Sequence, residues 1–384
     1  MKILVLGGDG YLGWPTSMHF AMRGHEVLIV DNCAKRMWEM QSGGKPLWRV
    51  PDLHDRTKLF KKITEKKIEF QIGDVTHHHF MYNEVFKDFL PDAVIHYAEQ
   101  PSAPFSMESL RKALYTQSNN VLGTLVVLHA IKEFAPNAHL IKLGTMGEYG
   151  TPNIDIEEGW LEVEHNGRKD RVLYPKRAGS WYHQSKVHDS HNIEFACRVW
   201  GLRATDLNQG VVYGIDTDET VLHRDLGTSF HYDEVFGTVL NRFCVQAVAG
   251  VDLTVYGKGG QTRGFLNIKD TLRCVELAVQ NPPQQGEFRV FNQFTEVFRV
   301  WELAKMAQIS ARKLGISISV QHWDNPRVEA EEHYYNAKNT SLLSLGLKPH
   351  LLSEKVISDM IERVQKDKHL IDSDIIPPKI KWNK

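Results

Sequence analysis

Three glycines near the start of the chain constrain the fold more than any other feature. The apolar run Lys2 to Gly7 predicts a β-strand, and Gly10 and Gly13 follow Gly7 in the spacing GxxGxxG. Glycine is favoured there because a Cβ atom would obstruct the turn, a bound pyrophosphate or the packing of the next helix, whose N-terminus offers amide donors. The pattern predicts a dinucleotide-binding loop. The residues expected to contact the cofactor are Gly7, Gly10, Tyr11, Leu12 and Gly13.

Strand-like apolar runs alternate with helical segments through the first half of the chain. This alternation predicts an α/β fold, a Rossmann-type doubly wound parallel sheet with helices on both faces. Helices are expected to begin near Tyr11, Phe80, Ser106 and Ser180, and the stretch 32–68 is expected to contain a short helix. The expected strands are Lys2 to Gly7, Glu26 to Asp31, Glu69 to Ile72, Ala93 to Tyr97, His139 to Gly144 and Leu202 to Gln209.

The regularity decays beyond Tyr213. The sequence therefore predicts a Rossmann domain over residues 1–213 and a smaller C-terminal α/β lid domain over residues 214–384, packed on the carboxyl edge of the sheet. Some segments of the second half are expected to return to the first domain. The elements expected there are helices at Gly237 to Ala249, near Thr271 to Gln280 and near Val300 to Leu314, and a strand at Leu253 to Tyr256.

The composition excludes several classes of protein. With 384 residues, of which 42% are apolar and 24% charged, the chain matches a globular protein and not a disordered, collagen-like or coiled-coil one. Its net charge of -1 provides no long-range attraction for a polyanion, so no nucleic acid partner is expected. The apolar helical stretch from Val121 to Ile131 is too short to cross a bilayer, so no membrane insertion is expected.

The cysteines and the N-terminal residues predict a cytoplasmic location. The first strand begins at once, without the apolar h-region of a signal peptide. The cysteines have neither disulfide-framework nor metal-site spacing, which fits reduced thiols in the core. The run His77 to His79 is expected to be solvated surface, and no metal site is predicted. The four cysteines are Cys33, Cys197, Cys244 and Cys274.

Asp31 indicates which dinucleotide binds. It ends the second expected strand, 18 residues after Gly13, where a carboxylate can accept the hydrogen bonds of the adenosine ribose. A 2′-phosphate would meet this negative charge, so NAD is favoured over NADP, although the nearby Arg36 keeps the choice open. Further cofactor contacts are expected from Asn32, Arg36, Asp74 and Val75.

Tyr182 and Lys186 are the candidate catalytic pair. Their four-residue spacing places them on one face of a helix. A free tyrosine has a pKa of about 10, too high for a base at neutral pH, and an adjacent lysine together with a cationic nicotinamide would favour the phenolate. Thr145, after the fifth expected strand, can hydrogen-bond the same sugar oxygen that Tyr182 deprotonates.

Taken together, these motifs resemble the extended short-chain dehydrogenase/reductase superfamily, whose members act on nucleotide sugars. Dehydratases of this superfamily carry an acidic pair directly after the threonine. This chain has Met146 and Gly147 there and a carboxylate one position later at Glu148, which disfavours an ordinary dehydratase.

Longer segments resemble one family within it, UDP-sulfoquinovose synthase, over Met1 to Trp382. That resemblance implies that UDP-glucose and sulfite give UDP-sulfoquinovose and water, with bound NAD returned unchanged. The family has a basic residue where this chain has Pro101. The segments that carry the resemblance are Leu143 to Glu158, Tyr182 to Ile193, Arg203 to Gly214, Tyr256 to Gly264 and Asn325 to Asn336.

The resemblance assigns C4 oxidation to Tyr182 and Lys186, with Thr145 holding the C4 oxygen. Glu148 and His183 become candidates for moving protons at C5 and C6; the open alternatives are a structural carboxylate and a histidine outside the pocket. Loss of the C6 hydroxyl would leave a conjugated 4-keto-5,6-ene, to which sulfite can add at C6. The groups expected to surround sulfite are Ser102, Thr145, Ser180 and His183, with Met146 as a nonionisable wall.

Binding of the UDP group is expected mainly from the second half. Arginine suits a diphosphate because its planar fork binds two oxygens at once. The resemblance also implies cofactor contacts from Asn119 and Gln209, and a homodimer. The expected substrate contacts are Asn208, Gln209, Tyr256, Gln261, Arg263, Arg327 and Glu329.

Two other functions fit parts of the pattern. A UDP-sugar 4-epimerase or a nucleotide-sugar dehydratase would share the Rossmann motifs. A non-catalytic NAD-sensing protein would keep the fold, but the joint presence of Thr145, Tyr182 and Lys186 disfavours it.

Overall fold

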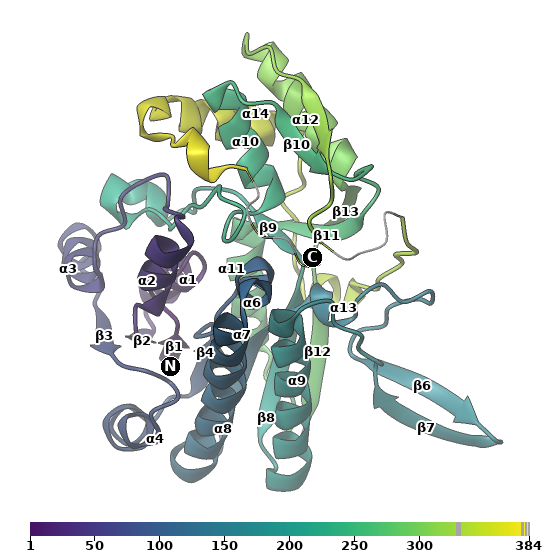
Figure 1. The fold of residues 1–384 in the computed structure, drawn as a ribbon. Helices are drawn as coiled ribbons and strands as arrows, with labels where there is room; N and C mark the ends of the chain where they lie inside the picture. Colours follow the sequence, from purple (N-terminus) through teal and green to yellow (C-terminus); the bar gives the residue numbers. More distant parts are fainter. Residues whose placement is uncertain (328–331, 378–379, 381, 383–384) are drawn as a thin grey trace.

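A seven-stranded parallel sheet organises the molecule (Figure 1). The computed structural model describes residues 1–327, 332–377, 380 and 382. The strand order is β12-β8-β5-β4-β1-β2-β3, and every pairing in this sheet is parallel. The predicted doubly wound α/β fold is confirmed. The strands are β1 (Lys2–Leu6), β2 (Glu26–Asp31), β3 (Ile68–Ile72), β4 (Ala93–His96), β5 (His139–Thr145), β8 (Arg203–Gln209) and β12 (Phe288–Gln293).

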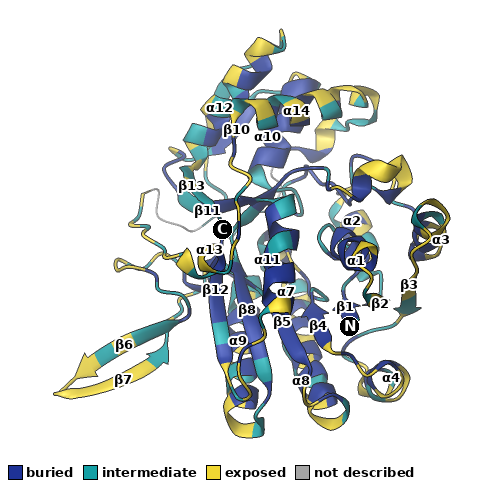
Figure 2. Cartoon of the chain, turned by 180° about the vertical axis from the view of Figure 1, so that it is seen from behind, coloured by how far each residue is buried: buried dark blue, intermediate teal, exposed yellow. Residues whose placement is uncertain are grey.

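Alternate residues of β1 show how helices cover both faces. Ile3 and Val5 join a buried cluster with α1 (Gly13–Met22) and α11 (Ile268–Gln280). Leu4 and Leu6 join a second cluster with α8 (Gly123–Phe134) and α9 (Trp181–Trp200) on the other face. Because side chains alternate along a strand and both faces are covered, an uninterrupted apolar run such as that of β1 is what a central parallel strand needs. Figure 2 shows the central strands as buried.

Part of the second half of the chain forms a layer above the carboxyl ends of the strands (Figure 1). One apolar cluster unites its three longest helices with two parallel strands. Other parts of the second half, α11 and β12, lie in the layers of the main sheet. The boundary at residue 213 remains a prediction. The elements of the upper layer are α10 (Val239–Ala249), β10 (Leu253–Tyr256), α12 (Val300–Lys313), β14 (Val320–Trp323) and α14 (Glu354–Gln365).

Several elements were not expected from the sequence. β6 (Trp160–His165) and β7 (Arg168–Leu173) form an antiparallel hairpin that projects from the body (Figures 1 and 2). A three-stranded sheet joins β9 (Val211–Tyr213), β11 (Thr262–Asn267) and β13 (Glu296–Arg299). The stretch after β2 holds two helices, α2 (Ala34–Ser42) and α3 (Leu53–Thr64), where one short helix was predicted.

The remaining helices are short. No helix in the described part of the chain is long and apolar enough to span a membrane. These helices are α4 (His78–Phe80), α5 (Lys87–Phe89), α6 (Ala103–Glu108), α7 (Leu110–Gln117) and α13 (Thr340–Ser344), with π-helical turns at Met81–Phe86 and Ser118–Leu122 and 3₁₀ turns at Met146–Glu148, Thr220–Leu222, Arg224–Leu226, Lys368–Leu370 and Ser373–Ile375.

Candidate active site

A cavity of about 360 Å³ opens at the carboxyl edge of the sheet. The strand order reverses between β1 and β4, and in open α/β sheets this switch point is where ligands bind. The cavity brings together twelve of the residues predicted from sequence. They are Gly7, Gly10, Tyr11, Leu12, Gly13, Asp31, Asn32, Val75, Asn119, Thr145, Tyr182 and Gln209.

The glycine-rich loop has the geometry that a dinucleotide requires. Gly7 has a φ of +86°, and a Cβ atom on it would lie 2.6 Å from the backbone of Tyr97 and Ala98. A Cβ atom on Gly13 would lie 2.0 Å from the carbonyl oxygen of Gly7, whereas one on Gly10 would meet nothing closer than 3.7 Å. Glycine is therefore required at two positions to close the loop, and the third keeps the wall of the cavity open.

Asp31 reaches the cavity with both oxygens held by backbone donors. Its Oδ2 accepts from the amide of Asp9 at 2.8 Å and its Oδ1 from the amide of Cys33 at 2.7 Å. Burial raises the pKa of Asp31 to about 6, and the nearby charge of Asp9 adds to the rise. The carboxylate is thus fixed in position, as a ribose-binding group must be.

Two predicted cofactor contacts lie behind the cavity wall instead of in it. Asp74 accepts from the side chain of Asn32 at 2.9 Å, so it positions a lining residue. Arg36 donates to the carboxylate of Asp9 and to the carbonyl oxygens of Val50 and Pro51. Most of its guanidinium donors are engaged within the protein, and its contact with the cofactor stays a prediction.

Tyr182 and Lys186 lie on one face of α9, as their spacing predicts. The Lys186 Nζ lies 5.7 Å from the centre of the Tyr182 ring, donates to the carbonyl of Leu143 at 2.6 Å and forms an ion pair with Glu99. Tyr182 and Thr145 both line the cavity. The Tyr182 amide donates to Ser106 Oγ at 3.1 Å, which fixes the start of the helix.

The pKa of Tyr182 differs from the expectation. Burial raises this pKa above its ordinary value, and the carboxylate of Glu99 raises it further. Glu99 offsets the ammonium charge of Lys186, which was expected to favour the phenolate. Burial and Glu99 together favour the protonated phenol, and the positive charge of a bound cofactor would oppose them.

Glu148 does not reach the cavity. Its side chain is completely buried, with Oε1 accepting from the amide of Thr145 at 3.2 Å and Oε2 accepting from Ser190 Oγ at 2.9 Å. Burial alone would raise the pKa of Glu148, but the ammonium groups of Lys142 and Lys176 outweigh it and lower this pKa to about 2. The geometry corrects the expectation of a proton-moving group, because this carboxylate is held inside an ion-pair network.

His183 and Ser180 form a pair at the start of α9. Ser180 Oγ caps the helix by accepting from the His183 amide at 3.2 Å, and it lies 3.0 Å from Nδ1 of the same histidine. Burial lowers the pKa of His183 to about 3, and the charges of Arg327 and Arg263 lower it further. The imidazole is therefore neutral, and two arginines predicted to bind substrate lie near it.

Three other predicted substrate contacts are engaged inside the protein. Ser102 Oγ donates to the carbonyl of Val235 at 2.6 Å and caps α6. Asn208 donates to the hydroxyl of Tyr149 at 2.8 Å, and Met146 packs in an apolar cluster with the same tyrosine. None of the three lines this cavity, and their assignment as direct substrate contacts stays a prediction.

The remaining described residues predicted to bind substrate do not line the cavity. Gln261 donates to the carbonyl of Tyr256 at 3.4 Å, Arg263 contacts His333 Nε2 at 3.3 Å, and Arg327 stacks over Trp382. Glu329 lies outside the described residues.

Two groups of site residues were missed. Glu99 follows β4 at the carboxyl edge, so the position of the preceding strand could have indicated it. Most of the others come from the irregular stretch before α10, which has no periodic pattern to reveal its path, and Asn241 lies in the first turn of α10. These lining residues are Ser229, His231, Val235, Phe236, Thr238 and Asn241, facing Lys35 and Trp38 of α2.

The comparisons with known proteins agree with this geometry. The chain belongs to the NAD dependent epimerase/dehydratase family, whose model matches residues 3–292. It is thus an NAD-dependent enzyme. Within that family it is similar to UDP-sulfoquinovose synthase: it is 54% identical over 383 residues to the chloroplastic protein of Spinacia oleracea, covering 100% of this chain and 79% of that one. It is 43% identical over 392 residues to the protein of Sulfolobus acidocaldarius, covering 100% and 98%.

Solved structures support the fold. The UDP-glucose 4-epimerase of Thermotoga maritima with UDP-glucose has a TM-score of 0.72 at 20% identity, covering 95% of this chain and 99% of that one. The epimerase of Bifidobacterium longum in complex with NAD+ and UDP has a TM-score of 0.71 at 20% identity, covering 97% and 100%.

Proposed function

We propose that this enzyme makes UDP-sulfoquinovose from UDP-glucose and sulfite. The observation that carries the proposal is that Thr145 and Tyr182 line the same cavity as the glycine-rich loop and Asp31. The extensive identity to two UDP-sulfoquinovose synthases supports this reaction over the simpler ones of the family.

The residues of the cavity fit NAD. The loop from Gly7 to Gly13 and the N-terminus of α1 would hold the pyrophosphate, and Asp31 would accept the hydrogen bonds of the adenosine ribose. Asn119 and Gln209 line the cavity as well, and would complete the binding of the dinucleotide. When bound, NAD supplies a reversible acceptor for the hydride of the sugar C4.

Tyr182 acts at the C4 hydroxyl. Its phenolate takes the proton of that hydroxyl as the sugar is oxidised, and Thr145 holds the C4 oxygen by a hydrogen bond. Lys186 lies behind the ring, where its ammonium stabilises the phenolate. The resulting 4-keto group acidifies the C5 proton, so the C6 hydroxyl can leave as water.

Sulfite then adds to C6 of the conjugated 4-keto-5,6-ene. Its sulfur lone pair forms the C–S bond, C5 regains a proton, and the C4 ketone is reduced to the alcohol. His183 is the group we assign to proton exchange near C5 and C6, because its imidazole is neutral and packs beside Gly147, two residues after Thr145. Glu148 supports the end of β5 by accepting a hydrogen bond from the Thr145 amide.

Arg263 and Arg327 are proposed to bind the diphosphate of the UDP-sugar. The charges of both lower the pKa of His183, which supports a position near the start of α9.

A cytoplasmic location remains part of the proposal, supported by four free cysteines, all in the described part of the chain.

We also propose a homodimer formed through α7 and α9. Large apolar side chains are exposed on these neighbouring helices, including Leu110 at 76% and Trp181 at 52%. Leu114, Phe195 and Val199 are exposed on the same helices. Light scattering of the purified protein would give twice the chain mass, and Leu110→Glu would shift it toward the monomer.

Incubation with UDP-glucose, with and without sulfite, followed by mass analysis of the nucleotide sugar, tests the reaction. We expect a sulfonated hexose only when sulfite is present, and none from Tyr182→Phe. UDP-galactose as the product would instead identify a 4-epimerase, and a 4-keto sugar formed without sulfite would identify a dehydratase. If denaturation of the protein released no NAD, a non-catalytic role in binding a partner would be favoured instead.

A further inference from the structure

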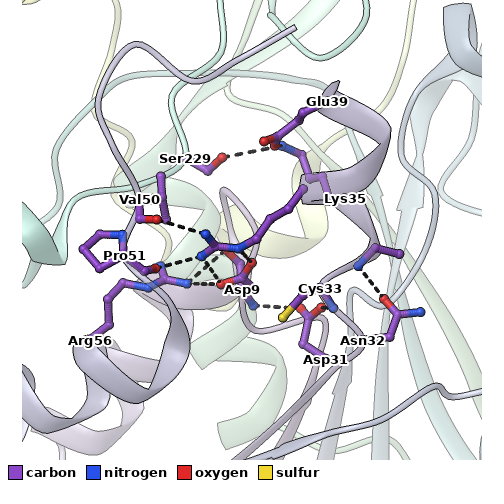
Figure 3. Close-up of polar contacts among 12 residues, drawn as sticks. Asp9, Asp31, Asn32, Cys33, Lys35, Glu39, Val50, Pro51, Arg56 and Ser229 are labelled. Carbon is purple, nitrogen blue, oxygen red and sulfur yellow. Dashed lines mark hydrogen bonds and ion pairs between the residues drawn. The ribbon is translucent and has the colours of Figure 1, made fainter. Parts of the chain in front are cut away.

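Asp9, in the middle of the glycine-rich loop, forms ion pairs with Arg36 and with Arg56, the second of which is labelled in Figure 3. Arg36 of α2 donates through Nε to Oδ2 at 2.7 Å and through Nη2 to Oδ1 at 2.9 Å. Arg56 of α3 forms an ion pair with the same carboxylate through Nη2 and is completely buried. One carboxylate thus holds two guanidinium groups that come from different helices.

The clamped carboxylate lies next to the expected ribose site. The Asp9 amide donates to Asp31 Oδ2 at 2.8 Å, and both residues line the cavity. Burial raises the pKa of Asp31, and the charge of Asp9 raises it further, so the two carboxylates lie within electrostatic range of each other. A ribose bound to Asp31 would therefore place its 2′ substituent close to the clamp.

The two arginines are the kind of residue that binds a 2′-phosphate in NADP-dependent Rossmann enzymes. Arg36 is largely engaged, since it also donates to the carbonyl oxygens of Val50 and Pro51 at 2.9 and 2.7 Å. Arg56 stacks over Trp14, and its Nε and Nη1 have no hydrogen-bond partner among the described residues. Asp9 is thus the carboxylate that neutralises this buried cation.

We propose that Asp9 is a specificity-determining residue for the dinucleotide. By holding Arg36 and Arg56, its carboxylate keeps both cations from a 2′-phosphate and adds a second negative charge beside Asp31. The loop that binds the pyrophosphate thereby also excludes NADP. This inference rests on dinucleotide binding and is independent of the sulfur chemistry, so either can fail without the other.

The test is the binding of NAD and NADP to the full-length protein after its nucleotide has been removed, measured by calorimetry. Asp9→Asn keeps the backbone amide that holds Asp31 but frees the two arginines. We expect the NADP-to-NAD affinity ratio to rise about ten- to a hundredfold, the worth of one hydrogen bond between charged groups. Asp9→Glu, the charge-preserving control, should retain the preference for NAD.

The double variant Asp9→Asn with Arg36→Gln should lose part of the gained NADP affinity, since one cation is gone. If Asp9 only shaped the loop, both affinities would fall together, and an unchanged ratio in Asp9→Asn would overturn the proposal. Asp9→Ser, with a smaller side chain, provides a second neutral variant, and the rise in thermal unfolding temperature with each nucleotide gives the same comparison in dilute samples.

Discussion

Lys186 and Glu99 form a buried ion pair directly behind Tyr182, with side chains exposed by only 4% and 2%. The pair links the residues after β4 to the first turns of α9. It fixes the ammonium beside the phenol ring, and it also cancels part of the charge that would favour the phenolate. The state of Tyr182 therefore depends on the pair and not on the lysine alone.

Glu99→Gln tests this dependence. Because the Glu99 carboxylate raises the pKa of Tyr182, removing this charge should lower that pKa. The acidic limb of the plot of kcat against pH should therefore move to lower pH. Stability should fall by about 3–5 kcal/mol, the usual effect of removing one partner of a buried ion pair. Glu99→Asp, which keeps the charge, is the matched control. A limb that stays in place, or moves upward, would contradict the role of Glu99.

Tyr182→Phe should leave folding intact and reduce turnover. The ring still fills the same space, but the group that takes the C4 proton is missing, so we expect a loss of about 10²–10⁴ in kcat. Product formation and thermal unfolding should be measured on the same sample. Wild-type rates in this variant would refute the assignment.

Thr145→Ala should also slow the reaction sharply. The change removes the hydroxyl that holds the C4 oxygen, and with it the hydrogen bond accepted from the Gly147 amide at 3.1 Å. The structural cost of losing this cap is about 1 kcal/mol. Thr145→Ser keeps the hydroxyl and should restore most of the rate. Equal rates for the alanine and serine variants would show that the hydroxyl has no part in catalysis.

Glu148→Gln should affect stability more than chemistry. The folded-state pKa of Glu148 is about 2, below its ordinary 4.5, so its ionised form stabilises the fold above pH 4.5. That stabilisation is lost as the pH falls from 4.5 through 2. We expect the variant to be about 3–5 kcal/mol less stable at pH 7, with a gap to wild type that narrows in acid. Urea unfolding at several pH values would measure it. A difference in unfolding free energy that does not change with pH would contradict the assignment of a negative charge to Glu148.

NAD should copurify with the protein. The reaction returns the cofactor to its starting state, and second-half residues such as Phe236 and Asn241 line the cavity together with the glycine-rich loop. Denaturation of the purified enzyme should release close to one NAD per chain. A need for stoichiometric added NAD in each turnover would argue against this retention.

The sequence predicts most of the main sheet because β1, β2 and β4 contain apolar runs that alternate with helical segments. β12 was missed although it pairs along its whole length with β8, since its position in the sheet depends on contacts distant in sequence. The hairpin of β6 and β7 was also missed, although Leu161 to Glu164 alternate between apolar and charged residues and Asn166-Gly167 forms the turn between the strands.

The site was predicted where motifs follow strands. The glycine-rich loop, Asp31, Thr145 and Tyr182 meet in the cavity, because the carboxyl ends of parallel strands share one edge. The direction of a side chain is harder to predict. Glu148 points into the interior because Lys142 and Lys176 offer it cations there, and no pattern in the sequence indicates that network.

The most direct test of the account uses UDP-glucose deuterated at C4, supplied with sulfite to the purified enzyme. The account predicts a sulfonated UDP-hexose that keeps the deuterium, because the hydride removed from C4 returns to the same carbon. A sulfonated product without the label, or a labelled sugar that never gains sulfur, would contradict it.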